Sequence, residues 1–182
     1  MSRPALLVLE DGRTFRGESY GAEGETFGEA VFSTAMTGYQ ETLTDPSYHR
    51  QVVVMTAPHV GNTGVNNEDA ESRRIWVSGF VVRDPARRTS SWRSRRALVD
   101  ELAAQEVVGI SGIDTRALTR HLRERGAMRV GVTTLDTDEA SFLTRVQAAP
   151  VMDGADLTAE VTTTDAYAVS YTHLTLPTKR IV

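Results

Sequence analysis

Residues 51–56 (QVVVMT) form a short run of side chains in which no polar residue interrupts Val52 to Met55. Such a run, rich in valine, is typical of a strand that is buried on both faces. The chain has 182 residues, of which 40% are hydrophobic and 24% charged, and this is enough for one good core. The composition is that of a globular domain and argues against a disordered, collagen-like or membrane protein.

The first half of the chain is rich in strand patterns. Residues 5–9 are apolar, an Asp-Gly turn follows at residues 11–12, and residues 13–17 alternate polar with apolar side chains. This pattern predicts two strands joined by a turn. Further strands are expected at residues 30–32 and 75–82.

The second half alternates helix with strand. Asp114 is a suitable helix N-cap and Gly126 a suitable C-terminal stop, so we expect a helix at residues 115–125 with Leu118 and Leu122 on one face. The other expected elements are a helix capped by Ser94 with Leu98 and Leu102 on one face, strands at 107–111 and 130–133, and a helix at 138–149 with Phe142, Leu143 and Val146 inward. The whole pattern predicts an α/β fold, as a single mixed domain of about 150 residues.

Two long segments, residues 34–48 and 57–67, fit neither the helix nor the strand period, and such segments are often functional. They contain Asp45, Ser47 and His59, the residue types of a Ser-His-Asp hydrolase. No G-x-S-x-G motif surrounds Ser47. A turn at residues 45–47, in which side chains bond the nearby backbone, is therefore the stronger interpretation.

Other patterns point away from a metal site, a phosphate loop or thiol chemistry. Residues 61–64 (GNTG) lack the length and the lysine of a phosphate-binding loop. The chain has no cysteine, which excludes disulfides, thiolate metal sites and a cysteine nucleophile. No metal-ligand spacing relates the four histidines His49, His59, His121 and His173.

Basic residues gather in two places. Residues 83–96 carry six arginines against one aspartate, and the helix expected at 115–125 carries a stripe of Arg116, Arg120 and Arg123. We interpret both as solvated faces, with docking of an acidic surface or a phosphate by residues 83–96 as the alternative. The net charge of −4 argues against a nucleic-acid partner, although binding through residues 83–96 stays a weaker alternative.

No secretory or membrane segment is expected from the sequence. The apolar run near the N-terminus ends at Glu10 and Asp11, which is too short for a signal peptide. No later run approaches 18 apolar residues. We therefore predict a cytoplasmic protein with no membrane partner.

Several long motifs occur in an order that resembles one family. They are ALLVLEDG from Ala5, VFSTAMTGYQETLTDPSY ending at Tyr48, PHVGNTGVN from Pro58, GIDTRALTRHLRERGAM from Gly112, and LTAEVTTTDAY ending at Tyr167. Together they look like the N-terminal domain of the small, glutamine-hydrolysing subunit of carbamoyl-phosphate synthetase. The similarity runs almost without gaps from Ala5 to about Tyr167.

The resemblance implies a three-layer swivelling β/β/α domain that packs on a class I glutamine amidotransferase domain and contacts a large subunit. It implies that the large subunit uses ATP, Mg²⁺ and bicarbonate and receives ammonia through a tunnel, to make carbamoyl phosphate for arginine and pyrimidine synthesis. Ser47, in the TDPSY motif, matches the family residue that helps to hold L-glutamine. No catalytic residue, metal ligand or cofactor site is expected in this chain, because the Cys-His-Glu triad belongs to the amidotransferase domain.

The resemblance ends near residue 168, so we expect residues 1–168 to form the small-subunit N-terminal domain and the amidotransferase domain to be missing. Residues 169–182 look like translated adapter sequence, and they contain Lys179, the one lysine among 20 basic residues. We interpret this tail as an artefact of a truncated reading frame. The isolated chain is then expected to lack glutaminase activity, and a stand-alone docking module for the large subunit is the alternative.

Overall fold

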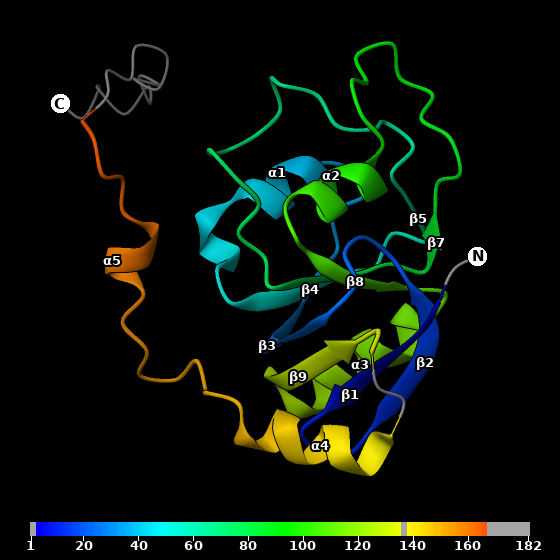
Figure 1. Cartoon of the computed structure of the whole chain (residues 1–182), viewed down its shortest axis with the longest axis vertical. Coiled ribbons are helices and arrows are strands. Elements are labelled where there is room, and N and C mark those ends of the chain that lie inside the picture. Colours follow the sequence, from blue (N-terminus) through cyan, green and yellow to red (C-terminus); the bar gives the residue numbers. More distant parts are fainter. Residues whose placement is uncertain (1–2, 136–137, 167–182) are drawn as a thin grey trace, which may run out of the picture.

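The computed structural model describes residues 3–135 and 138–166, and these form a mixed α/β protein (Figure 1). The strands are β1 (Pro4–Leu9), β2 (Thr14–Ser19), β3 (Glu25–Ser33), β4 (Gln51–Met55), β5 (His59–Val60), β6 (Gly79–Val81), β7 (Asp84–Pro85), β8 (Val108–Ser111) and β9 (Met128–Thr133). The helices are α1 (Tyr39–Thr44), the 3₁₀ helix η1 (Pro46–Tyr48), α2 (Leu98–Ala104), α3 (Thr115–Arg125), α4 (Glu139–Ala148) and α5 (Thr158–Val161). The prediction of a strand-rich first half followed by alternating helices and strands is confirmed.

Within the described residues, seven strands close into a barrel in the order β1-β2-β8-β6-β4-β3-β9. The pairs β3–β4, β4–β6 and β6–β8 are parallel, whereas β1 and β9 are antiparallel to each of their neighbours. A separate parallel pair joins β5 to β7. Because β3, β4, β6 and β8 point in one direction, the segments that follow them start at the same rim of the barrel.

The valine-rich strand β4 is buried on both faces, as predicted. Val52 and Val54 lie in the core inside the barrel, which also contains β1, β8 and β9 side chains. Val53 and Met55 point the other way, into a second core under α1 and α2. All four side chains are at most 1% exposed, because each face of the strand has its own apolar layer.

The helices of the second half cover the rest of the barrel. Leu118 and Leu122 of α3 belong to the core inside the barrel, so this helix closes part of it. Helix α4 lies at the outer side of β1, where Phe142 and Val146 form a third cluster with Leu6 and Val8 (Figure 1). Strand β1 therefore has apolar layers on both faces too.

The termini of α3 follow the predicted capping. The Asp114 side chain accepts a hydrogen bond from the Ala117 backbone N–H at 2.9 Å. Gly126 ends the helix with φ +93°, a conformation that residues with a Cβ rarely adopt. Asp138 caps α4 in the same way. These two helices begin and end where local side-chain chemistry predicts.

The prediction that Ser94 caps the helix containing Leu98 and Leu102 is wrong. Helix α2 begins at Leu98 with Ala97 at its N-cap and no side-chain cap. The physical reason is a β-bridge between Val65 and Arg96, in which the Val65 N–H donates to the Arg96 carbonyl at 2.9 Å. This bridge holds the chain extended past Ser94, so the helix starts later.

The expected strand at 75–82 is shorter in the structure, where β6 spans only Gly79–Val81. The backbone N–H groups of Ile75 and Trp76 donate outside the sheet, to the Gln105 side chain at 2.7 Å and to the Leu43 carbonyl at 2.9 Å. Apolar residues before β6 are therefore buried by packing in the second core rather than by sheet pairing.

Beyond α4, the chain leaves the body and carries α5 beside it (Figure 1). Glu160 of α5 accepts a hydrogen bond from the Arg50 guanidinium at 2.6 Å and pairs with His49 Nε2 at 2.7 Å. The longest helix in the described ranges, α3, has 11 residues, and no described helix could cross a membrane. The tail predicted at 169–182 lies outside the described residues.

Phe142 provides a test of the packing of α4 on β1. Its side chain is fully buried, and its ring centroid lies 5.7 Å from that of Phe27. We expect Phe142→Ala to lower the free energy of unfolding by about 3–5 kcal/mol, because apolar burial is lost and a cavity remains. Urea unfolding followed by circular dichroism measures this change.

The matched control for Phe142→Ala is Val151→Ala, since Val151 is 55% exposed. This control should change the free energy of unfolding by less than about 0.5 kcal/mol. Equal effects of the two substitutions would show that α4 does not pack on β1 as described.

Candidate functional site

The two segments that fit neither period meet above the rim where the parallel strands end. Segment 34–48 follows β3 and segment 57–67 follows β4, and a cavity of about 400 Å³ lies between them. We call it the loop cavity; its lining includes Met36, Tyr39, Gln40, His59, Asn66 and Arg93. This position is consistent with the prediction that the two segments are functional, because ligands often bind at the carboxyl ends of parallel strands.

Tyr39 joins the two segments at the base of the loop cavity. Its buried hydroxyl donates to the Gly64 carbonyl at 2.7 Å and accepts from the Thr63 hydroxyl at 2.7 Å. Burial raises the pKa of the Tyr39 phenol, so the group stays neutral near pH 7. Gly61 and Gly64 have positive φ, in agreement with the turn predicted at residues 61–64. Tyr39 is thus a structural link.

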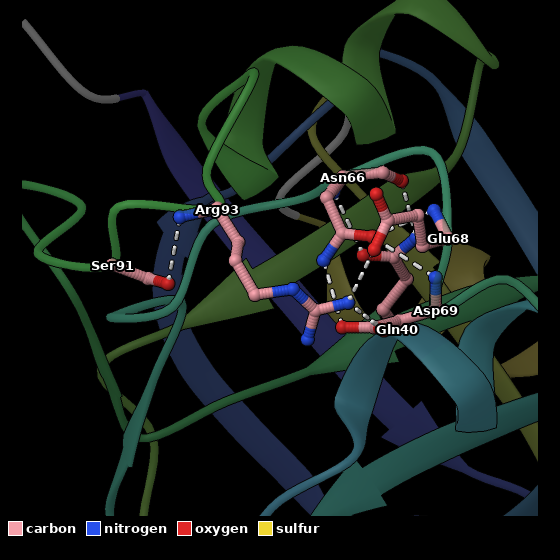
Figure 2. A network of polar contacts seen from close by, with 6 residues as sticks. All are labelled: Gln40, Asn66, Glu68, Asp69, Ser91 and Arg93. Carbon is pink, nitrogen blue, oxygen red and sulfur yellow. Dashed lines mark hydrogen bonds and ion pairs between the residues drawn. The ribbon is translucent and has the colours of Figure 1, made fainter.

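A second link pairs the side chain of Gln40 with the backbone of Asn66 (Figure 2). The Gln40 amide nitrogen donates to the Asn66 carbonyl at 2.7 Å, and the Gln40 amide oxygen accepts from the Asn66 N–H at 3.0 Å. The Asn66 side chain in turn accepts from the backbone N–H groups of Glu68 and Asp69. Both amides are therefore used to fix the loop after β4.

Arg93 completes this network from the segment between β7 and α2 (Figure 2). Its guanidinium donates to Asp69 at 2.6 Å and to Glu68 at 3.1 Å. The hydrogen bond from the Asn66 side chain and the one from Arg93 hold the pKa of the Asp69 carboxyl below its usual range. Asp69 is therefore an ionised partner for Arg93 at neutral pH, and the network shapes the cavity wall.

Ser47, the predicted glutamine-binding residue, lies in η1 and does not line the loop cavity. The Asp45 side chain accepts a hydrogen bond from the Ser47 backbone N–H at 2.8 Å, as predicted for a turn. The Ser47 side chain is exposed, and no described residue forms a hydrogen bond with its hydroxyl. Its donor and acceptor capacity is therefore available to a ligand.

The residues of the alternative Ser-His-Asp hydrolase do not come together. His59 Nδ1 lies 3.0 Å from Asp84, while Asp45 is engaged by the Ser47 backbone. His49 and His121 pair with Glu160 and Asp11 instead. Among the described residues, no group of three or more His, Asp or Glu side chains could hold a metal ion, and His173 lies outside them.

The arginines of residues 83–96 are largely exposed, as expected for a solvated loop. Arg93 and Arg96 are paired with carboxylates, and Arg83 lies 3.8 Å from Asp114. These pairs reduce the local positive charge that nucleic-acid binding would need. The pairs of Arg93 and Arg96 with carboxylates hold this loop against neighbouring parts of the chain.

The sequence analysis missed the residues that connect the loops, among them Gln40, Asn66 and Asp69. The signal available for them was weak: asparagines between glycines favour turns but do not reveal a partner. Gln40 lies in α1, a helix that the periodicity of residues 34–48 did not predict, because its buried positions include the polar Gln40 and Thr44, which bond the segment between β5 and β6.

Comparison with known proteins identifies the family. Residues 7–132 match the family described as carbamoyl-phosphate synthase small chain, CPSase domain.

The chain belongs to the carbamoyl-phosphate synthase small-chain family.

The relatives named carbamoyl phosphate synthase small chain agree with this assignment. The protein of Streptomyces coelicolor is 76% identical over 168 residues, which are 91% of this chain and 44% of that protein. The protein of Mycolicibacterium paratuberculosis is 60% identical over 173 residues, 93% of this chain and 46% of that protein. The protein of Corynebacterium diphtheriae is 55% identical over 170 residues, which are 91% of this chain and 45% of that protein. The chain spans less than half the length of these curated relatives.

The region that matches the carbamoyl-phosphate synthase small-chain family runs from β1 into β9. It contains Ser47, the loop cavity and the whole of α3. The family resemblance found in the sequence is therefore confirmed.

Asp69 gives a test of the network in Figure 2. We expect Asn66→Ala and Arg93→Gln each to raise the pKa of Asp69 toward its ordinary value of about 3.9, because each removes a hydrogen bond to the carboxylate. The folded-state pKa is lowered, so the stabilisation is present above the ordinary value and is lost as the pH falls through the lowered one. Carbon-detected NMR titration of the Asp69 carboxyl measures its pKa in each variant.

The control for the Asp69 titration is Arg88→Gln, which removes an exposed arginine outside the network. It should leave the pKa of Asp69 where it is. An Asp69 pKa that stays low in Asn66→Ala and in Arg93→Gln would contradict the hydrogen bonds described.

Proposed function

We propose that this chain is the N-terminal part of the small subunit of a glutamine-dependent carbamoyl-phosphate synthase. In the complete small subunit, a following amidotransferase domain in the same chain would release ammonia from L-glutamine. The large subunit would use this ammonia with bicarbonate, ATP and Mg²⁺ to make carbamoyl phosphate. The enzyme would work in the cytoplasm and supply arginine and pyrimidine synthesis.

The observation that carries this proposal is the similarity to part of proteins named carbamoyl phosphate synthase small chain, at 76% identity over 91% of this chain and 44% of one relative. The architecture supports it, since a strand-rich barrel with outer helix layers suits the swivelling three-layer β/β/α domain that we propose for this region. The chain would contribute a docking surface for the large subunit and one side of the glutamine site.

We assign Ser47 to that glutamine site. Its hydroxyl is exposed and has no described hydrogen-bond partner, and its backbone is held in place by Asp45. A serine hydroxyl can donate to the carboxylate of glutamine or accept from its ammonium group. The pairs of His49 and Arg50 with Glu160 hold α5 beside the two residues that follow η1.

The chain cannot itself form a glutamyl thioester, because it has no cysteine. We therefore propose that the isolated chain is inactive as a glutaminase. Docking on the large subunit without catalysis is the second candidate, and the same lack of a nucleophile favours it for the isolated chain.

Ser47→Ala, made in the complete small subunit that contains this region, tests the assignment of Ser47. We expect KM for glutamine to rise about tenfold, the effect of one lost hydrogen bond of roughly 1.4 kcal/mol. Carbamoyl phosphate synthesis from added ammonium chloride should stay the same, because ammonia bypasses the glutamine site.

Ser141→Ala is the matched control, since Ser141 is an exposed serine on α4. It should change neither activity. An unchanged KM for glutamine in Ser47→Ala would remove Ser47 from the proposed site, and a loss of both activities would point to misfolding instead.

The isolated chain of 182 residues should release no ammonia from glutamine above a blank. Coupled assay with glutamate dehydrogenase measures this release. The same preparation, added to the large subunit, should be retained with it on a size-exclusion column if the docking proposal holds. Ammonia release clearly above the blank, with contaminating enzyme removed, would contradict the first expectation, and separate elution would contradict the second.

A further inference from the structure

Another cavity, of about 430 Å³, shares no lining residue with the loop cavity. Its lining consists of Thr34, Thr56, Arg116, Thr119, Arg120 and Arg123. Thr34 follows β3, Thr56 follows β4, and the other four residues belong to α3. We call it the arginine cavity. The registered pair Ser33 and Met55 precedes the two threonines, so they stand side by side at the rim.

The three arginines of this cavity have no described carboxylate partner. Among the described residues, no carboxylate lies within ion-pair distance of Arg116, Arg120 or Arg123. By contrast, Arg93, Arg96, Arg129 and Arg145 are each paired with a glutamate or aspartate. The cavity therefore has positive charge that the described protein does not neutralise.

The placement of Arg116 and Arg120 works against local stability. Arg116 and Arg120 are four residues apart on α3 and Arg123 is three further on, so like charges are neighbours on one helix face. Arg116 also lies in the first turn, where the helix dipole disfavours a cation. A bound anion would relieve both unfavourable interactions. Local rules broken in this way are expected at binding sites.

Thr119 provides an independent observation. Its hydroxyl oxygen is buried, and no hydrogen-bond partner is found for it among the described residues. Elsewhere in the described helices, threonine hydroxyls donate to the carbonyl four residues earlier, as in Thr42, Thr44 and Thr144. Thr119 does not, although a buried hydroxyl without a partner is costly. The hydroxyl oxygen is closed off from solvent, and rotation of the Thr119 side chain would turn it toward a ligand oxygen in the cavity.

We propose that the arginine cavity binds the phosphate group of a small molecule. Guanidinium groups donate two parallel hydrogen bonds to phosphate oxygens, and threonine hydroxyls complete the donor set. A hollow of this size suits a small ligand. The site lies at the carboxyl ends of the parallel strands β3 and β4, which is where ligands bind in many α/β proteins.

Titration of the full chain with inorganic phosphate and with tripolyphosphate, followed by ¹H–¹⁵N NMR at constant ionic strength, tests the proposal. We expect saturable shifts at α3 amides and at the side-chain Nε–H groups of the three arginines. Arg116→Gln/Arg120→Gln should weaken binding about tenfold or more. The matched control Arg87→Gln/Arg88→Gln removes the same charge from an exposed loop and should change binding by less than about twofold.

Thr119→Val separates a specific site from general attraction to positive charge. It has nearly the same shape and no hydroxyl, so we expect weaker phosphate binding, by about threefold or more. The urea midpoint without phosphate should not fall, because the substitution removes a buried hydroxyl for which the described residues provide no partner. This stability measurement also shows that the variant folds.

Three outcomes would overturn the proposal. One is the absence of saturable shifts at α3. Another is an equal loss of binding in the two double variants, which would show general electrostatic attraction. The third is a response to a glutamate-rich peptide but not to phosphate or tripolyphosphate, which would assign the arginines to an acidic protein surface instead.

Discussion

The burial of β4 on both faces is the constraint on which the rest of the molecule depends. Val52 and Val54 face the inside of the barrel, while Val53 and Met55 face the layer under α1 and α2. A strand with apolar side chains on both faces is stable only between two apolar layers. Closure of the sheet supplies the inner layer, and the two short helices supply the outer one. Segments 34–48 and 57–67, which line the loop cavity, follow strands β3 and β4 of this layered structure.

Parallel strands explain why distant segments become neighbours. The chain crosses the barrel in the same direction in β3, β4, β6 and β8, so each following segment begins at one rim. Hydrogen bonds then engage several polar groups of the loop cavity wall, as Gln40 with Asn66 and Asp69 with Arg93 show (Figure 2). Ser47 stands outside this network, and no described residue bonds its hydroxyl. Within one rim, some polar side chains hold the scaffold and others are available to ligands.

Arginine has two roles in this chain that sequence does not separate. Arg93 and Arg129 are held by carboxylates and contribute to local structure. Arg116, Arg120 and Arg123 share a helix face beside an open cavity with no described carboxylate near them. Paired guanidinium groups are partly neutralised, whereas unpaired ones keep their capacity for an anion. The difference lies in the neighbours that the fold brings, because the residue type is the same.

Much of this protein is determined by sequence alone. Short-range chemistry sets the strands with apolar runs, the caps of α3 and α4, the turn at Asp45 and the absence of thiol chemistry, and the long motifs carry the family. Local patterns failed where long-range contacts decide: the Val65–Arg96 bridge delays α2, and residues before β6 pack without sheet pairing. Closure of the barrel, the pairing of the two loops across one cavity and the isolation of the α3 arginines were decided only by tertiary structure. The reason is that each depends on which distant groups become neighbours, whereas a cap or a strand depends on residues a few positions away.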